Sequence, residues 1–150
     1  MDHQENQEKN FRLSAKSFIV NDGNILVLKR AANDVHKPNI WEFPGGRLDL
    51  GEDPREGLKR ETKEETGLDI DILHPLSVKH FTREDGQIIT MLIFLCKTSE
   101  TNLDKVSNIK LSEEHSEFVW VPIEKSKEIL PVFFHPEVDI FKKLDLQKYM

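Results

Sequence analysis

The stretch that decides the fold runs from Gly46 to Leu68 and reads GRLDLGEDPREGLKRETKEETGL. Within it, Glu61, Glu64 and Glu65 fall at relative positions 0, +3 and +4. On a helix of about 3.6 residues per turn, these three carboxylates lie on one face, within about 100° of one another. Like charges at this spacing destabilise a helix, so the cluster needs a compensating partner. A hard divalent cation such as Mg²⁺ or Mn²⁺ is such a partner, because it prefers oxygen ligands.

The residues around this cluster predict a helix with defined ends. Asp53 can cap the N-terminus, and Pro54 suits the first helical position. Gly67 stands where a helix C-terminus needs a residue in the left-handed conformation. The pattern therefore predicts a loop, a helix of about three turns and a second loop. Arg60 lies beside the acidic face, where it could orient a carboxylate or contact a phosphate.

At these positions the sequence resembles the Nudix box, which reads glycine, five residues, glutamate, seven residues, then Arg-Glu-hydrophobic-any-Glu-Glu-any-Gly-hydrophobic. The residues that fill it in register are Gly46, Glu52, Arg60, Glu61, Glu64, Glu65, Gly67 and Leu68. Thr62 departs from the pattern, since the family usually has Ile, Leu or Val there, and its hydroxyl is expected to weaken the packing of the helix slightly. So many fixed positions are far more specific than a single short glycine motif, and the chain is identified as a member of the Nudix family.

The resemblance implies an α/β protein with the Nudix fold over nearly all of residues 12–148. This fold is an α/β/α sandwich with a mixed sheet and a loop-helix-loop Nudix box, whose helix lies between two sheets. The hydrophobic periodicity agrees, because strand patterns alternate with helical ones and two strand pairs flank turn-forming residues. The expected strands are 13–20, 25–28, 41–43, 70–81, 87–97 and 118–121, and the expected helices after the box are 125–130 and 138–148.

The resemblance also implies roles for the acidic residues of the box. Mg²⁺ or Mn²⁺ would be held by Glu61, Glu64 and Glu65. Glu52 is either a further source of metal ligands or a partner for Arg60. A cation held there would polarise phosphoryl oxygens and stabilise a leaving pyrophosphate, so Arg60, Glu61 and Glu64 are expected to be catalytic.

A second acidic cluster lies downstream, before the strand that contains Trp120. Nudix enzymes of the MutT type carry an additional catalytic or metal-binding glutamate in this region. The spacing back from Trp120 favours Glu114, and Glu113 and Glu117 are the alternatives. Either Glu61 or Glu114 would accept a proton from the attacking water.

The segment before the box predicts contacts with phosphates. Gly45 and Gly46 permit a close approach of the backbone to a phosphate or a metal-bound water. Residues 30–46 (RAANDVHKPNIWEFPGG) are similar to the corresponding stretch of MutT-type nucleoside triphosphate pyrophosphohydrolases. By this resemblance Arg30 would contact the phosphates of the substrate. A base could stack on Phe134 or its neighbours, or these side chains could pack in the core.

The resemblance favours hydrolysis of a (d)NTP, oxidised purine nucleotides included, to a (d)NMP and pyrophosphate. An ADP-ribose or NDP-sugar pyrophosphatase is one alternative, although the family's marker residues after the box are absent here. A non-catalytic nucleotide-sensing module is an alternative of another class, and the complete set of glutamates argues against it. A metal-dependent isomerase of the isopentenyl diphosphate type is a weaker resemblance.

Length and composition set further bounds on the class of protein. A chain of 150 residues suits one domain, expected over 12–150 after a flexible tail at 1–11. The net charge of −6 argues against a nucleic acid polymer as partner, and no apolar run reaches the length of a membrane span. The single cysteine, Cys96, is expected to be a buried structural thiol. These features favour a cytoplasmic protein, and relatives make a homodimer possible.

Overall fold

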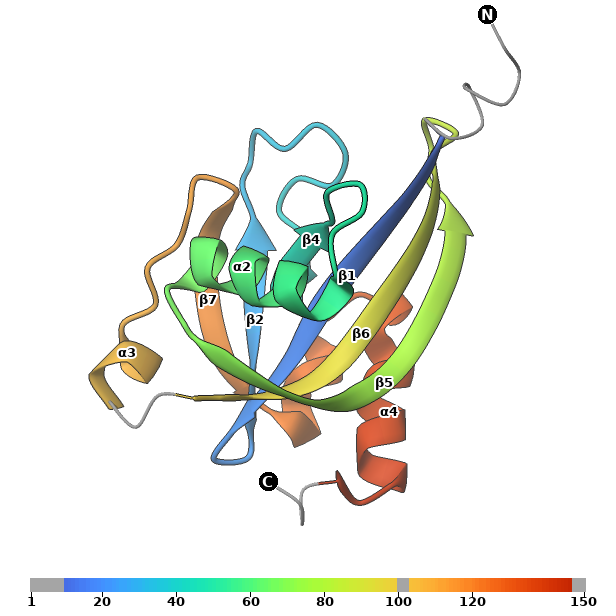
Figure 1. Cartoon of the computed structure of the whole chain (residues 1–150). Helices are drawn as coiled ribbons and strands as arrows, with labels where there is room; N and C mark the ends of the chain where they lie inside the picture. Colours follow the sequence, from blue (N-terminus) through green and yellow to red (C-terminus); the bar gives the residue numbers. More distant parts are fainter. Residues whose placement is uncertain (1–9, 100–102, 147–150) are drawn as a thin grey trace, which may run out of the picture.

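The protein is built around one mixed sheet with helices on both faces (Figure 1). The computed structural model describes residues 10–99 and 103–146. The strands are β1 (Phe11–Asn21), β2 (Asn24–Arg30), β3 (Trp41–Glu42), β4 (Gly45–Arg47), β5 (Ile70–Thr82), β6 (Ile88–Thr98) and β7 (His115–Pro122). The helices are α2 (Pro54–Thr66), α3 (Leu103–Ser107) and α4 (His135–Lys143), with 3₁₀ helices η1 (Ile123–Glu128) and η2 (Val132–Phe134).

Strand β1 joins two branches of the sheet. It pairs in parallel with β6, which in turn pairs antiparallel with β5. It also pairs antiparallel with β4 through Ser14–Lys16 and with β2 at Val20 and Asn21. Strand β2 carries β3 and β7, so the sheet order is β3-β2-β1-β6-β5 with β4 beside β1 and β7 beside β2. The two sheets expected from the family resemblance are therefore branches of one seven-stranded sheet.

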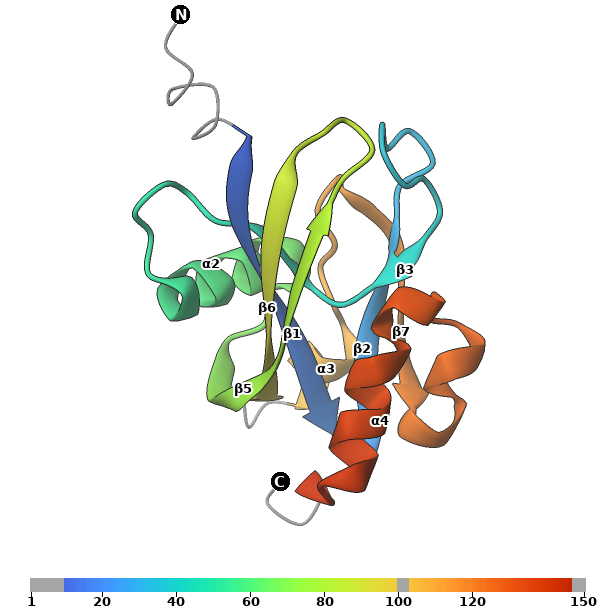
Figure 2. The ribbon, with the colours of Figure 1, turned by 90° about the vertical axis from the view of Figure 1, so that its right-hand side faces the viewer.

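The period-two alternation of the strands creates a separate core on each face of the sheet. Ile25 and Val27 of β2 belong to the core under α4, together with Phe141, whereas Leu26 and Leu28 belong to the core under α2, together with Leu58. Figures 1 and 2 show α2 and α4 on opposite sides of the sheet. The expected α/β/α sandwich with a mixed sheet is confirmed.

Helix α2 begins and ends where the sequence predicts. Asp53 Oδ1 accepts hydrogen bonds from the backbone N–H groups of Arg55 and Glu56, at 2.8 and 3.2 Å. At the other end Gly67 has a φ of 80°, and its N–H donates to the Lys63 carbonyl at 2.9 Å. The helix is thus fixed between two loops by interactions that are local in sequence.

Thr62, the departure from the family pattern, is fully buried on the inner side of α2. Its hydroxyl lies 3.1 Å from the Ser17 hydroxyl of β1, and Ser17 Oγ is also 3.1 Å from the Pro44 carbonyl. Because a buried hydroxyl with a partner avoids most of the desolvation cost, Thr62 ties the helix to the sheet by a hydrogen bond.

The remaining elements follow the sequence predictions with local differences. Both expected hairpins form, as β1–β2 and β5–β6. The helix expected at 125–130 is wrong in type, because residues Ile123–Glu128 form the 3₁₀ helix η1 after Pro122. The last helix begins at His135 and ends at Lys143, and α3 had no sequence prediction.

The tail expected at 1–11 lies mostly outside the described residues, and β1 begins at Phe11. Within the described part of the chain, no helix is both long and apolar enough to span a membrane.

Candidate active site

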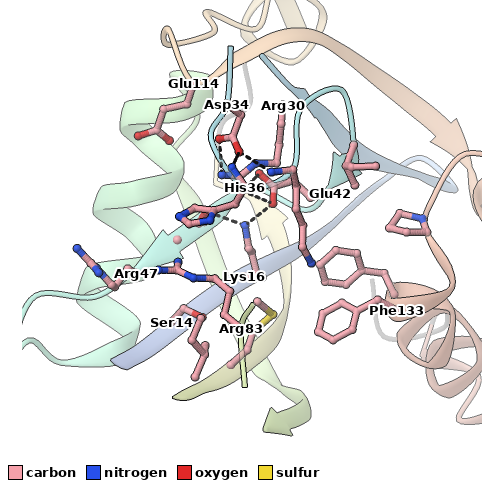
Figure 3. Close-up of a pocket in the computed structure, with 18 of the residues that line it drawn as sticks. Ser14, Lys16, Arg30, Asp34, His36, Glu42, Arg47, Arg83, Glu114 and Phe133 are labelled. Atoms are coloured by element: carbon pink, nitrogen blue, oxygen red, sulfur yellow. Dashed lines mark hydrogen bonds and ion pairs between the residues drawn. The ribbon is translucent and has the colours of Figure 1, made fainter. Parts of the chain in front are cut away.

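A cavity of about 860 Å³ lies between the sheet, α2 and the segment that precedes α4. Figure 3 shows Glu114 near α2 on one side of it, Phe133 on the other, and Lys16, Arg30 and Glu42 between them. The cavity therefore has an acidic end, a charged middle and an aromatic end. A volume of this size suits a small molecule of nucleotide dimensions.

The acidic end is built by α2 and the loop before β7. Glu61 and Glu65 lie one turn apart on the helix, and Glu114 lies next to them at the same end of the cavity. Glu65 is 3% exposed, and its Oε2 accepts a hydrogen bond of 2.6 Å from the Gly45 N–H. Burial, assisted by nearby carboxylates, raises the pKa of Glu65 to about 9. Burial, together with the charges of Glu64 and Glu114, also raises the pKa of Glu61.

This donor set fits a divalent cation. Three carboxyl groups converge at one end of the cavity, and burial raises the pKa of two of them, Glu61 and Glu65. Carboxylate oxygens are the ligands that Mg²⁺ and Mn²⁺ prefer. Gly46 lies directly above, and a Cβ there would stand 3.4 Å from Glu61 Oε2. The absence of a side chain at Gly46 keeps the space over this carboxylate open.

Arg60 donates hydrogen bonds to three acidic residues of the box, Glu52, Glu61 and Glu64. Its Nε and one Nη each lie 2.9 Å from an oxygen of Glu52. The other Nη lies 3.2 Å from both Glu61 and Glu64. The Arg60 hydrogen bonds lower the pKa of Glu52 to about 2. Glu52 and Glu64 do not line the cavity, so as metal ligands they stay predictions, whereas Glu52 as the partner of Arg60 is observed.

The charged middle of the cavity converges on Glu42, a residue that the sequence analysis missed. Glu42 Oε1 accepts hydrogen bonds from Lys16 Nζ at 3.0 Å and from Arg30 at 3.1 Å. Glu42 Oε2 lies 2.8 Å from His115 Nε2. Lys16, Glu42 and His115 are all nearly inaccessible to solvent. A signal existed in the sequence, because Lys16 interrupts the apolar run of a predicted strand and a buried lysine needs an anionic partner.

Arg30 lines the cavity as expected, and the structure also gives it an acidic partner on each side. One Nη lies 2.6 Å from Asp34 Oδ2, and the other is bound by Glu42. Its Nε is buried and has no hydrogen-bond partner. The geometry thus holds the guanidinium rigidly at the cavity wall.

The aromatic end assigns different environments to Phe133 and Phe134. Phe134 is 5% exposed and packs on Phe43 and Phe133 at centroid distances of 4.8 and 4.9 Å. Of the two alternatives left by the sequence, core packing therefore accounts for most of its surface. Phe133 contacts Phe81 edge-on at 5.2 Å, and the ammonium group of Lys79 lies 4.5 Å from its centroid.

The arrangement is that of an α/β/α sandwich whose acidic helix lies at a cavity that the cationic side chains of Lys16 and Arg30 also line. The chain belongs to the Nudix family, since the NUDIX domain model matches residues 10–138. It is 41% identical to the 8-oxo-dGTP diphosphatase of Escherichia coli over 54 residues, which are 36% of this chain and 42% of that protein. It is 30% identical to an RNA pyrophosphohydrolase of Campylobacter jejuni subsp. doylei, over 91% of this chain and 92% of that protein.

The fold agrees with solved structures of the family. The MutT protein of Methanosarcina mazei Go1 superposes with a TM-score of 0.73 at 27% identity, over 93% of this chain and 96% of that one. The alignments with a MutT-like protein of Streptomyces ambofaciens and with the E. coli enzyme cover only 46% and 42% of those relatives. The names of these relatives give different substrates, 8-oxo-dGTP in one and RNA in another, so membership of the family leaves the substrate open.

Proposed function

We propose that the protein hydrolyses a nucleoside or deoxynucleoside triphosphate to the monophosphate and pyrophosphate, with Mg²⁺ or Mn²⁺. The observation that carries this proposal is that one cavity brings three carboxyl groups, Glu61, Glu65 and Glu114, together with Lys16 and Arg30. A triphosphate carries negative charge on all three phosphates. A divalent metal neutralises part of this charge, and cationic side chains are needed for the remaining oxygens. The resemblance of residues 30–46 to MutT-type enzymes supports the triphosphate as substrate.

The acidic residues would have two roles: some would bind the metal, and one would accept the proton of the attacking water. Glu61, Glu65 and Glu114 would hold the cation at the cavity wall, and Glu64 would join them if Arg60 releases it. A cation bound there supplies electrostatic stabilisation of the phosphoryl oxygens and a more acidic water. Glu61 or Glu114 would accept the proton of the attacking water.

The other cavity residues would bind the substrate. Arg30 faces the space between the acidic and aromatic ends and would contact the phosphates. The glycines Gly45 and Gly46 leave room for a phosphate to approach the backbone. Phe133 offers a ring near the cavity mouth, and Phe134 would support it from the core. The expected cytoplasmic location and a homodimer stay predictions.

The test is a screen for pyrophosphate-bond cleavage with Mg²⁺ and Mn²⁺. It compares dNTPs, 8-oxo-dGTP, 5′-triphosphorylated RNA, ADP-ribose, NDP-sugars and dinucleoside polyphosphates. We expect a nucleoside triphosphate to give the highest kcat/KM, with monophosphate and pyrophosphate as products. Preference for ADP-ribose or an NDP-sugar would favour the alternative pyrophosphatase. Nucleotide binding in calorimetry without turnover of any substrate would favour the sensing module.

A pair of variants on one helix tests the site itself. Glu65→Gln removes a carboxylate ligand of the proposed cation, and we expect kcat to fall at least 100-fold, because a removed electrostatic contact costs about this much. Glu56→Gln is the matched control, since Glu56 lies in the first turn of the same helix and is exposed. Activity of Glu65→Gln within tenfold of the wild type would exclude the proposed site.

A further inference from the structure

His115 is a buried histidine with one ring nitrogen engaged and the other without a partner. It is 5% exposed and lines the cavity beside Glu114. Its Nε2 lies 2.8 Å from Glu42 Oε2, whereas its Nδ1 is buried and has no hydrogen-bond partner. Nearly all buried polar atoms in folded proteins have a partner, so an unpartnered Nδ1 in a ligand cavity indicates a missing ligand.

The surroundings of Glu42 determine which ring nitrogen carries the proton. Glu42 already accepts hydrogen bonds from Lys16 Nζ and Arg30, so it acts as an ionised acceptor with no proton to give. Nε2 of His115 must therefore be the donor in their contact. The neutral ring then has its lone pair on Nδ1. Metal-binding histidines show this arrangement, in which a carboxylate accepts a hydrogen bond from one ring N–H and thereby orients the other nitrogen toward the metal.

Two carboxyl groups complete the set of donors. A ring nitrogen of His115 and one carboxylate oxygen from each of Glu65 and Glu114 all lie within 4.8 Å of one another. Ligands about 2.1 Å from a shared ion lie at most about 4.2 Å apart, so the set is nearly closed before any ion enters. Glu114 is exposed and precedes β7, so a small movement of its side chain would complete the closure.

We propose that His115 Nδ1, Glu65 and Glu114 form a mixed nitrogen–oxygen site for a divalent transition-metal ion. Imidazole suits transition metals, whereas Mg²⁺ prefers oxygen donors alone. The site thus favours Mn²⁺ or Co²⁺ over Mg²⁺. This inference builds on the proposed metal-dependent function and adds a nitrogen ligand, His115, to the carboxylates proposed above. Glu42 is the positioning residue that fixes the tautomer of His115.

The experiment measures metal binding by the full chain without nucleotide. Electron spin-echo spectroscopy of bound Mn²⁺ is expected to show a ¹⁴N coupling from imidazole in the wild type. His115→Gln is expected to remove that coupling and to raise the Kd for Mn²⁺ at least tenfold, with the Kd for Mg²⁺ changed less than threefold. His80→Gln is the matched control, because His80 lies on β5 outside the cavity and bonds Thr90. It is expected to keep both the coupling and the affinity.

A wild-type measurement protects the test against misfolding of the variant. In ¹⁵N-histidine protein, Zn²⁺ is expected to shift the His115 Nδ1 resonance while Nε2 keeps its proton. The absence of a ¹⁴N coupling in the wild type, its persistence in His115→Gln, or an unmoved Nδ1 resonance would each overturn the inference. Hydrolysis measured in parallel separates the two proposals, since turnover without nitrogen coordination contradicts only this one.

Discussion

Glu42 accepts hydrogen bonds from three cavity side chains, and its removal is expected to leave a buried charge uncompensated. In Glu42→Gln, Lys16 loses its counter-charge at a position that is 4% exposed. Breaking a buried pair from one side costs about 3–5 kcal/mol. We expect urea unfolding to show a loss of this size for Glu42→Gln and a smaller loss for Lys16→Met combined with Glu42→Gln. If the double variant lost as much stability as Glu42→Gln, or more, Lys16 and Glu42 would not act as a pair.

Asp34 gives the protein a dependence of stability on acid pH. Its pKa is lowered to about 2: burial acts in the opposite direction, but the hydrogen bonds from Arg30 and from the backbone of Lys37 and His36 outweigh it. The unfolded carboxyl titrates near pH 3.9. Its contribution is therefore complete above about pH 4 and is lost as the pH falls through 2.

The variant Asp34→Asn isolates this contribution. We expect it to be less stable than the wild type by roughly 1 kcal/mol at neutral pH, because the ion pair is partly solvated. The difference is expected to shrink below about pH 4, as the carboxyl of the unfolded wild-type chain takes up a proton that the folded protein binds only near pH 2. Unfolding by urea at several pH values measures it. A difference that stays constant down to pH 2.5 would contradict the assignment to Asp34.

Among the elements, β4 depends most on a single residue. Gly45 has a φ of 123°, and a Cβ there would lie 2.2 Å from the Ala15 carbonyl oxygen of β1. Gly45→Ala must therefore break the β1–β4 pairing or displace the backbone that holds Glu65, at a cost of about 3 kcal/mol or more. Thermal unfolding measures the loss.

Gly86 supplies the control for this prediction. It also has a positive φ, of 86°, but a Cβ there would meet nothing within 4 Å. Gly86→Ala is expected to cost about 1 kcal/mol from backbone conformation alone. Equal losses in the two variants would show that the close approach to β1 contributes nothing.

Elements whose signals are local could be predicted from the sequence, and those that depend on distant partners could not. Helix α2 is bounded by Asp53 and Gly67, which act within a few residues of the helix, so both ends were predicted correctly. The parallel pairing of β1 with β6 joins Phe11 to Ile88, and no short-range pattern encodes such a register. The short helix η1 has helical spacing, but its i→i+3 bonds after Pro122 arise from the turn at the end of β7.

At the scale of the whole molecule, the candidate site also has a part that local sequence signals predict and a part that depends on contacts between distant residues. The carboxylates of α2 could be predicted because residues three and four positions apart on a helix lie on the same face. Lys16, Glu42 and His115 come from three different strands, and only the folded sheet brings them within hydrogen-bond distance. The box motif thus indicated Glu61 and Glu65 at the acidic end of the cavity, the cluster before β7 indicated Glu114, and the chain's topology supplied the buried charged middle.

Cys96 provides a reporter for the whole sheet, because it is the single cysteine and is fully buried in β6. Strand β6 is paired on both edges, with β1 and β5. Burial raises the pKa of the Cys96 thiol, so little thiolate is present in the native state. We expect Ellman's reagent to react only as fast as the sheet opens, with urea accelerating it in proportion to unfolding. Rapid labelling of the native protein would contradict the central position of β6.

The acidic end of the cavity predicts how the whole molecule responds to metal removal. A cation that binds only the folded state stabilises it by about 2.7 kcal/mol at a concentration 100 times its Kd. For a chain of this size, that corresponds to a rise in Tm of roughly 5–10 °C. We expect Mn²⁺ to produce such a rise after treatment with EDTA, and Glu65→Gln to abolish most of it, while Glu56→Gln keeps it. Because burial raises the pKa of both Glu61 and Glu65, each ion bound should also release protons, measurable by calorimetry in buffers of different ionisation enthalpy. An unchanged Tm would show that the convergence of carboxyl groups at this end of the cavity binds no metal.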